Sequence, residues 1–409
     1  MALRYKQTEV GLIPEDWEVK SLGECLASTP RYGINAAAVP YSDRLPVYIR
    51  ITDISPDGRF APEKLVSVDN AQSPNYYLLD GDIVLARTGA SVGKSYKYDP
   101  NDGPLVFAGF LILIRPNPTR LISGYIASYL STRTYWNWVS LMSMRSGQPG
   151  INGKEYSQLP VPVPSIREQR EISISLSDVD DLIKNMDQLI IKKRDILQAA
   201  MQQLLTGQHR LPGFNGEWEM KRLGDVASLN RTSVVPFEYP DKKFTHFSLP
   251  AFDEGQEPIK ELGAKIGSNK FSVPADAILV SKLNPRIPRV WLPRSIPSNA
   301  IASTEFLVLT PKDIVMREFL YVTCKSSGFS AQMELAATGT TGSHQRINPA
   351  TALSLLVHVP YEKSEQAAVA RIISDMDAEL TTLEARRDKA RQIKQGMMQE
   401  LLTGRIRLA

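Results

Sequence analysis

The chain has 409 residues, a hydrophobic content of 43% and a formal net charge of +4 at pH 7, which are ordinary values for a water-soluble protein of two or three domains. The mild positive charge permits a nucleic-acid partner without demanding one, and the two cysteines, Cys25 and Cys324, lack the spacing of a metal site and fit a reducing compartment. Residues 1–20 do not resemble a secretory signal, and the most apolar stretch, residues 106–114, is too short to cross a bilayer, so we expect a cytoplasmic protein.

The first predicted domain, residues 1–164, consists of short β-rich runs that are broken by Gly and Pro. Residues 106–114 are expected to form one buried strand, and residues 123–139 one helix. This mixture predicts an α+β domain. Prolines at positions 160, 162 and 164 then end its last strand.

Residues 165–207 are predicted to form one long helix. Ser165 and Glu168 have the spacing of an N-terminal capping box, and Gly207 is a natural helix stop. Apolar residues recur between them at alternating spacings of four and three, which is the pattern of a coiled-coil seam, and Lys193 interrupts it. The predicted seam residues are Ile172, Leu176, Val179, Ile183, Met186, Ile190, Leu197 and Leu204.

A second domain, residues 208–363, and a second long helix, residues 364–409, repeat this arrangement. The Leu-Leu-Thr-Gly sequence that ends at Gly207 returns at Gly404, about 197 residues later, and this period is far too long for a solenoid. Arg387 and Lys394 interrupt the second seam. Its apolar residues are Val369, Ile373, Met376, Leu380, Leu383, Met397 and Leu401.

The two long helices are predicted to pair antiparallel. With about 40 residues each, they would be about 60 Å long. The second domain joins the end of the first helix to the start of the second, and a domain of that size has a radius of gyration of only about 15 Å. It connects those ends easily if they are adjacent, as they are in an antiparallel pair. The alternative, that each helix packs only on its own head, is less favoured because the helix is longer than the head.

The two domains share landmarks, whereas the residues between these landmarks differ. One scaffold that carries different loops is typical of two different recognition surfaces. We interpret the two asparagines among the landmarks as turn-forming residues. The landmarks, in order, are Trp17 and Trp218, residues 82–85 and 276–280, residues 110–114 and 306–310, and the Gly-rich loops that lead to Asn152 and Asn348.

The duplicated order of motifs resembles the specificity subunit of type I restriction–modification systems, and the resemblance covers essentially the whole chain. The second half departs from the pattern in its longer Gly-rich loop and in lacking the Ser-x-x-Glu helix start. The motifs are Trp17, the Gly-rich loop to Asn152, the Val-Pro run, Glu168-Gln169 and the final Leu-Leu-Thr-Gly, repeated at Trp218, residues 345–348, Val359-Pro360 and Glu365-Gln366.

The resemblance implies a fold of two β-rich target recognition domains, separated by two long antiparallel coiled-coil helices with an internal pseudo-two-fold repeat. Each head would read one half of a bipartite site in double-stranded DNA. The helices would set the spacing and dock two DNA-methyltransferase subunits, through which restriction and translocase subunits join. S-adenosylmethionine, ATP and magnesium would be bound by these partners, and no cofactor by this chain.

The residues themselves suggest no catalytic site. Residues 88–95 nearly match a phosphate-binding P-loop, but the first glycine falls one residue late and the second head has no counterpart. No Asn-Pro-Pro-Tyr or Asp-Pro-Pro-Tyr segment of an amino-methyltransferase and no Gly-x-Ser-x-Gly motif occurs, and the four histidines form no metal pattern. The chain alone therefore looks non-catalytic, and the resemblance implies that N6-adenine methylation and DNA cleavage belong to partner subunits.

DNA contacts are predicted from the chemistry of the loops. Arginine and lysine bind guanine edges, glutamine and asparagine bind adenine, and threonine contacts the thymine methyl group. Some of these residues would contact phosphates, which position a protein without specifying sequence. The candidates are Arg87, Thr88, Ser91, Lys94, Arg145 and Gln148 in the first head, and Lys282, Asn284, Arg286, Gln345 and Arg346 in the second.

Two other functions remain open. A free-standing, two-headed DNA-binding regulator would bind a specific sequence tightly without partners. A nucleotide-dependent enzyme that uses the P-loop-like segment would bind nucleotide in a simple assay. The nearly balanced charge favours a specificity subunit over both, because partner subunits would then help to hold the duplex.

Overall fold

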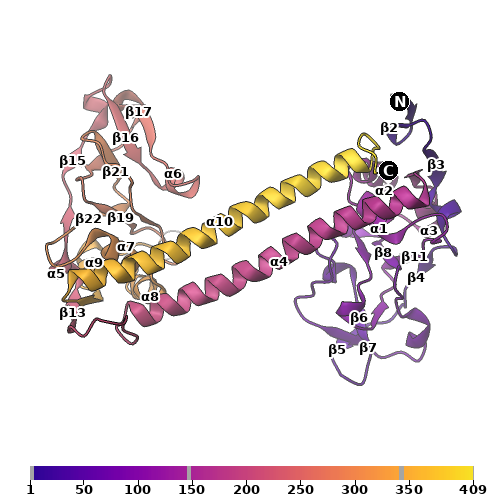
Figure 1. Cartoon of the computed structure of the whole chain (residues 1–409), viewed down its shortest axis with the longest axis horizontal. Coiled ribbons are helices and arrows are strands. Elements are labelled where there is room, and N and C mark those ends of the chain that lie inside the picture. Colours follow the sequence, from indigo (N-terminus) through magenta and orange to yellow (C-terminus); the bar gives the residue numbers. More distant parts are fainter. Residues whose placement is uncertain (1–3, 145–148, 340–344, 409) are drawn as a thin grey trace. The chain divides into compact units, whose positions relative to one another are not determined.

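In the computed structural model, which describes residues 4–144, 149–339 and 345–408, the chain forms two compact units (Figure 1). The first unit comprises Met1–Met186 and Arg386–Ala409, and the second comprises Asp187–Ala385. Two long helices, α4 (Ile166–Leu204) and α10 (Lys363–Leu401), contribute to both units. Each unit therefore consists of one head and one end of each long helix.

The described strands of the first head form two four-stranded sheets and two antiparallel pairs. β3 (Glu18–Ser21) pairs with β12 (Pro160–Val163), so the start and the end of the head lie side by side. The N-terminal β1 (Tyr5–Thr8) and β2 (Gly11–Pro14) form a hairpin. The central sheet has the order β4 (Arg31–Tyr32), β11 (Leu111–Ile114), β8 (Ile83–Ala86), β9 (Ser95–Lys97). The outer sheet has the order β10 (Leu105–Phe107), β6 (Val47–Ile49), β7 (Val66–Val68), β5 (Ala38–Pro40).

Two predicted elements of this head are wrong, because each is split in two. The single strand expected at residues 106–114 is β10 and β11, which lie in different sheets because the chain turns at Gly109. The single helix expected at residues 123–139 is α1 (Ser123–Tyr129) and α2 (Arg133–Ser143). The Thr132 hydroxyl accepts a hydrogen bond from the Tyr135 amide and begins a new helix. A short helix, α3 (Gly153–Ser157), follows.

The central sheet of the first head is buried on both faces, because successive side chains of a strand point to opposite sides. Ile83 and Leu85 of β8 belong to a core that includes α1, the start of α4 and the last turn of α10. Val84 and Ala86 belong to a second core, shared with the outer sheet. The head and the long-helix ends of the first unit therefore share one hydrophobic core.

The second head repeats this plan with its own strands and helices. β13 (Trp218–Arg222) pairs with β23 (Leu356–Pro360). The central sheet has the order β14 (Ala227–Asn230), β22 (Phe306–Pro311), β19 (Ile278–Ser281), β20 (Val290–Trp291). The outer sheet has the order β15 (Ser233–Val234), β18 (Lys270–Ser272), β21 (Ala300–Ser303), β16 (Lys243–Phe247), β17 (Ile259–Leu262). The helices are α5 (Leu223–Val226), α6 (Leu249–Asp253), α7 (Arg317–Lys325), α8 (Ser327–Leu335) and α9 (Pro349–Leu353).

The correspondence between the heads extends to strand direction. In each outer sheet one pair is parallel, β10 with β6 in the first head and β21 with β16 in the second. The single helix expected around residues 317–334 is again two, α7 and α8, because the Ser326 hydroxyl caps a new helix at the Phe329 amide. The break after the first of these helices therefore recurs in the same place in both heads.

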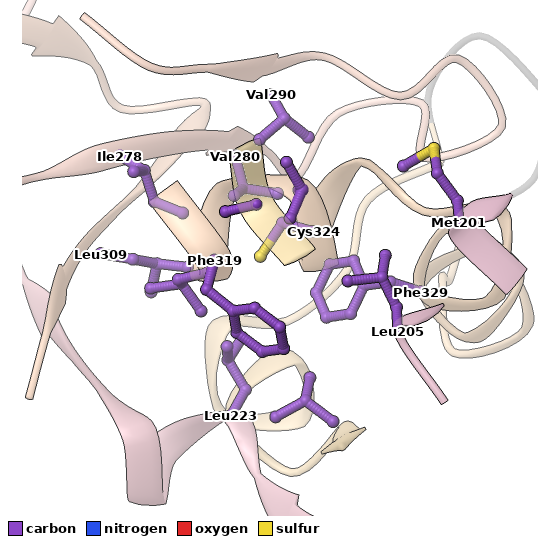
Figure 2. Close-up of a cluster of buried hydrophobic side chains, with 14 of the residues drawn as sticks. Met201, Leu205, Leu223, Ile278, Val280, Val290, Leu309, Phe319, Cys324 and Phe329 are labelled. Atoms are coloured by element: carbon purple, nitrogen blue, oxygen red, sulfur yellow. The ribbon is translucent and has the colours of Figure 1, made fainter. Parts of the chain in front are cut away.

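The core of the second unit joins its head to the end of α4 (Figure 2). Phe319 and Cys324 of α7 lie against Ile278 and Val280 of β19. Met201 from the end of α4 belongs to the same core, on the side of α8. Burial raises the pKa of the Cys324 thiol, so this cysteine acts as a small apolar core residue.

Within each unit, the segments of α4 and α10 run antiparallel, which is the direction predicted from connectivity. As residue numbers rise along α4 and the chain that follows it, the numbers of the paired residues fall. The pairs that show the direction are Glu168–Arg407 and Asp180–Lys394 in the first unit, and Arg194–Glu384 and Arg210–Glu365 in the second.

Within the described residues, no helix is both long and apolar enough to cross a membrane.

The predicted seam positions face inward along both helices. Two of the three polar interruptions form ion pairs across the helices: Lys193 Nζ lies 2.7 Å from a carboxylate oxygen of Glu379, and Lys394 Nζ lies 2.7 Å from one of Asp180. Arg387 pairs with Asp388 on its own helix. The buried seam residues are Ile172, Leu176, Ile183, Ile190, Leu197, Leu204, Val369, Ile373, Leu380 and Leu401, and the half-buried ones are Val179, Met186, Met376, Leu383 and Met397.

A buried glutamine ties the start of each long helix to its head. The Oε1 of Gln169 accepts from the Ile122 amide at 2.8 Å, and its Nε2 donates to the carbonyls of Arg120 and Pro164. Gln169 and Gln366 are both fully buried. Gln366 makes the same set of bonds in the second unit, to the Met316 amide and the carbonyls of Ile314 and Pro360.

The predicted capping box at the start of α4 is present only in part. The Ser165 hydroxyl accepts from the Glu168 amide at 3.2 Å. The Glu168 carboxylate does not return to Ser165, because it accepts from Trp17 Nε1 and from Arg407 in the C-terminal segment. Arg407 also binds Asp16, which lowers the pKa of that carboxyl. The C-terminal segment is thus part of the first unit.

Candidate nucleic-acid interface

In each head, three distant chain segments meet at the C-terminal end of one strand of the central sheet, which is β8 in the first head and β19 in the second. We call this place the recognition edge. In the first head, the Arg87 amide donates to the Phe110 carbonyl at 3.1 Å, and the Arg87 carbonyl accepts from the Ile151 amide at 2.9 Å. In the second, the backbone of Lys282 makes the same two bonds, at 2.9 and 3.1 Å, to Glu305 and Ile347. Arg87 therefore corresponds to Lys282, Phe110 to Glu305 and Gly150 to Arg346.

The edge of the first head carries an arginine that lies on an aromatic ring. The Arg87 guanidinium is centred 4.9 Å from the Tyr32 ring. The Tyr32 hydroxyl accepts from the Gly153 amide at 3.1 Å, so the ring is fixed from the other side. Phe110 stands beside them with 60% of its surface exposed. A hollow of about 640 Å³, lined in part by Tyr32, Arg87 and Phe110, opens next to this group.

The edge of the second head carries an arginine that is held by a carboxylate. Arg346 Nε donates to Glu305 Oε2 at 3.1 Å, and its Nη2 donates to Oε1 at 3.2 Å. The hydrogen bonds that the guanidinium donates to the Glu305 carboxylate raise the pKa of Arg346. Both heads thus present a fixed arginine at the edge, but its partner is aromatic in one and acidic in the other.

Three of the remaining candidates of the first head, Thr88, Ser91 and Lys94, lie in the loop after Arg87. Thr88 begins a 3-10 turn (η4, Gly89–Ser91) that includes Ser91, and Lys94 donates to the Ile54 carbonyl at 3.4 Å. Arg145 and Gln148 lie outside the described residues.

The P-loop-like segment has a geometry unlike that of a phosphate-binding loop. A P-loop leads into a helix whose N-terminus faces the phosphates. Here Ser95 begins β9, which returns antiparallel along β8 with Lys97 opposite Ile83. The segment is a hairpin turn, and this geometry argues against the nucleotide-dependent alternative.

The candidates of the second head surround Lys282, and one of them has a backbone role. Asn284 has a φ of 49°, a conformation that asparagine tolerates better than most residues. Its backbone N–H donates to the backbone carbonyl of Gln345 at 2.8 Å, and this bond joins two segments of the edge. Lys282 is half-buried and Arg286 is exposed. Asn152 and Asn348, read as turn residues, are helix N-caps of α3 and α9.

Tyr32, Phe110 and Glu305 belong to the edge and were missed from the sequence. The landmark alignment of residues 110–114 with 306–310 is shifted by one position. In the structure Leu111 pairs with Ala86 and Phe306 with Ser281, so Leu111 corresponds to Phe306. With that register, Phe110 and Glu305 align as two different residues at one position of the edge.

A second duplicated feature is a groove at the last turn of each long helix. In the second unit, a groove of about 680 Å³ lies between Gln202 on α4 and the N-terminus of α8. In the first unit, a groove of about 460 Å³ lies between Gln399 on α10 and the N-terminus of α2. Both are lined by the same helix positions, because Gln399 follows Gln202 by one repeat.

In the described part of the chain, no cluster of three His, Cys, Asp or Glu side chains is arranged to hold a metal ion.

Comparison with known proteins gives consistent matches. The chain is 28% identical over 236 residues to the putative type I restriction enzyme MjaX specificity subunit of Methanocaldococcus jannaschii, an alignment that covers 54% of this chain and 55% of that protein. The chain thus spans about half the length of this relative. The MjaVIII specificity subunit of the same organism is 21% identical over 422 residues, which cover 97% of this chain and 94% of the relative.

Solved structures share the fold. The S subunit of a type I restriction–modification system from M. genitalium matches with a TM-score of 0.62 and 13% identity, over 94% of this chain and 96% of that one. A chain from a structure of a type I R-M system matches with a TM-score of 0.55 and 17% identity, over 96% of this chain and 99% of that one.

The family comparison follows the internal repeat. A family model described as "Type I restriction modification DNA specificity domain" matches residues 14–192 and again residues 215–394. Each match includes one head and the greater part of the long helix that follows it. With this pattern present twice over most of its length, the chain belongs to the family of type I restriction–modification DNA specificity domains.

Proposed function

We propose that this chain is the DNA specificity subunit of a type I restriction–modification complex, and that each head reads one half of a bipartite DNA sequence. The observation that carries this proposal is the recognition edge. The same backbone bonds place Arg87 in one head and Lys282 with Arg346 in the other. One scaffold with different cationic and polar side chains is what two different half-sites require.

Catalysis belongs to partner subunits in this proposal. Methyltransferase subunits would bind S-adenosylmethionine and form N6-methyladenine, and restriction and translocase subunits would use ATP and magnesium. The duplicated grooves support two copies of one partner, because they repeat at equivalent positions while the edges differ. We assign the grooves to two methyltransferase subunits. Gln202→Arg and Gln399→Arg should each weaken binding of that subunit. Gln203 lies outside the groove, so Gln203→Arg should not.

The experiment that tests the function is a methylation map. The chain is combined with its cognate methyltransferase subunit and S-adenosylmethionine, and methylated DNA is sequenced. We expect a bipartite N6-methyladenine motif. Replacing residues 211–361 with those of a relative should change one half of the motif and leave the other intact. If both halves changed together, the assignment of one half-site to each head would be wrong.

The chain by itself provides the control. We expect it neither to methylate nor to cut DNA, and to bind its sequence weakly without partners. Methyl transfer by the pure chain would contradict the non-catalytic role. Tight, specific binding by the pure chain, with no effect of a methyltransferase subunit, would favour the free-standing regulator.

The long helices are proposed to set the gap between the half-sites. Inserting one heptad after Met186 and another after Ala385 keeps both seams in register and lengthens each helix by about 10 Å. Since base pairs stack about 3.4 Å apart, the methylated motif should gain about three base pairs of non-specific gap. An unchanged gap with full activity would show that the helices do not set the spacing.

A further inference from the structure

At the recognition edge of the second head, Arg346 is held at both its backbone and its side chain. Its backbone N–H and C=O each form a 2.9 Å bond with Thr338. Its Nε and Nη2 donate to the two oxygens of Glu305. Among the described residues, no other side chain accepts from this guanidinium. A guanidinium is planar and carries five N–H groups. The edge formed by Nε and Nη2 is bonded to Glu305, and the edge formed by Nη1 and Nη2 remains for another acceptor.

We propose that Arg346 reads a guanine through this second edge, and that Glu305 is the residue that positions it. The inference rests on the proposed DNA-recognition function. Guanine presents its O6 and N7 acceptors side by side in the major groove, and two adjacent N–H groups of an arginine match them. A guanidinium that is already oriented loses less conformational entropy when DNA binds.

The exposure of this ion pair supports a positioning role. The side chains of Arg346 and Glu305 are 47% and 26% exposed, so the pair contributes little to folding stability. A carboxylate at a DNA-facing edge would repel phosphates unless a cation neutralised it. Glutamate is also able to accept from cytosine, but both oxygens of Glu305 are engaged by Arg346.

The first head shows that the fold does not require this pair. Phe110 takes the place of Glu305, and Gly150 takes that of Arg346, yet the same backbone bonds form. The arginine of the first head comes instead from the end of β8, where Tyr32 orients it. Conservative substitutions at Glu305 and Arg346 should therefore leave the second head folded.

The test uses the full chain with its cognate methyltransferase subunit and a library of DNA sequences. Arg346→Gln and Arg346→Lys should relax one base position of one half-site by about 10- to 100-fold, because a bidentate contact is lost. Glu305→Gln should relax the same position to a smaller extent, and Glu305→Asp should restore part of the discrimination. The other half-site should stay unchanged in all four variants.

The matched control is Arg294→Gln. Arg294 is exposed and follows β20, whose Trp291 pairs with Leu279, so it lies toward the opposite end of β19 from Lys282. Its replacement removes the same charge from the same head. We expect no change at any base position. Circular dichroism and thermal melting of every variant would establish that the fold is retained.

Three outcomes would overturn different statements. If the Arg346 variants lowered methylation of all sequences equally and reduced the salt dependence of binding by about one counterion, Arg346 would contact a phosphate and the inference would be wrong. If Glu305→Gln changed a different base position, Glu305 would read a base itself. If the wild-type chain directed no bipartite methylation, the proposed function would fail before the inference was tested.

Discussion

The two heads hold the same three chain segments together but place the fixed arginine on different segments. In the first head Arg87 extends from the end of β8 and lies on Tyr32. In the second, Arg346 extends from the segment before α9 and is held by Glu305. The backbone bonds at Arg87 and Lys282 are the same. The comparison shows that the side chains of this edge can change without a change in the strands that support it.

The junction of head and helix is, by contrast, built from the same residue types in both units. Arg407 binds Glu168 beside Trp17, and Arg210 binds Glu365, with its guanidinium 5.9 Å from the Trp218 ring. The carboxylates of both pairs are buried, and the arginines are half-buried. Substitutions at the junction should therefore affect folding in both units, whereas those at the edge should affect the DNA sequence that is read.

The largest effect is expected from breaking the buried ion pair of a junction. Arg407→Ala leaves the Glu168 carboxylate, which is 4% exposed, without its cation. Loss of one partner of a buried pair costs about 3–5 kcal/mol, and the unfolding free energy in urea should fall by this order. Arg210→Ala should act similarly through Glu365. Adding Glu168→Gln to Arg407→Ala should restore part of the loss, and a double variant no more stable than the single one would contradict this explanation.

A somewhat smaller loss is expected at the two buried glutamines. Gln169→Ala leaves the Ile122 amide and two carbonyls without their partner, and Gln366→Ala does the same in the second unit. Each of the three lost hydrogen bonds contributes about 0.5–1.5 kcal/mol net, so the summed loss should be about 1.5–4.5 kcal/mol. Thermal melting should show comparable destabilisation for both variants. Gln188→Ala, at an exposed position of α4, is the control and should melt like the wild type.

A modest effect, confined to one half-site, is expected from Tyr32. Tyr32→Leu removes the ring beneath Arg87, and exposed cation–π contacts contribute about 0.5–1 kcal/mol, so discrimination in the first half-site should fall by about two- to fivefold. Tyr32→Phe keeps the ring and should retain discrimination. Methylation maps would provide the measurement. A change in the half-site read by the second head would show that the two edges are not independent.

The smallest effect concerns pH and distinguishes the heads, because all four histidines lie within residues 208–363. Burial lowers the pKa of His246, although Glu261 on β17 opposes this with a hydrogen bond and Lys270 on β18 adds to it. The folded state therefore resists the proton that an unfolded histidine binds below about pH 6.5. Stability should fall as pH drops below that value. In urea unfolding at pH 7.5 and 5.5, the loss should be smaller for His246→Asn, and an equal loss would exclude His246 as the cause.

Some parts of this molecule could be predicted because they are periodic. The seam from Ile172 to Leu204 repeats over many turns, so helix type, length and inward face all follow from spacing. Shorter elements gave weaker signals. The breaks before Arg133 and Ser327 depend on single hydroxyl caps, and the split of residues 106–114 depends on one turn at Gly109. Apolar content is high on both sides of each break, so the pattern of hydrophobic residues does not show where one element ends and the next begins.

The recognition edge shows what the tertiary structure had to supply. The sequence pointed to Arg87 and Arg346 as cationic loop residues, but not to Tyr32 or Glu305. These partners come from segments about 55 and 40 residues away and meet the arginines only through strand register.

The sequence by itself determined the internal repeat, the two long helices, their antiparallel direction and the family resemblance, because these depend on local periodicity, connectivity and short motifs. The tertiary structure decided which side chains meet. It placed Glu168 on Arg407 of the C-terminal segment instead of in a local capping box, and it gave each arginine at the edge its own partner. The physical reason is that hydrogen bonds and ion pairs act over a few ångströms, and the chain must fold before residues distant in sequence come that close.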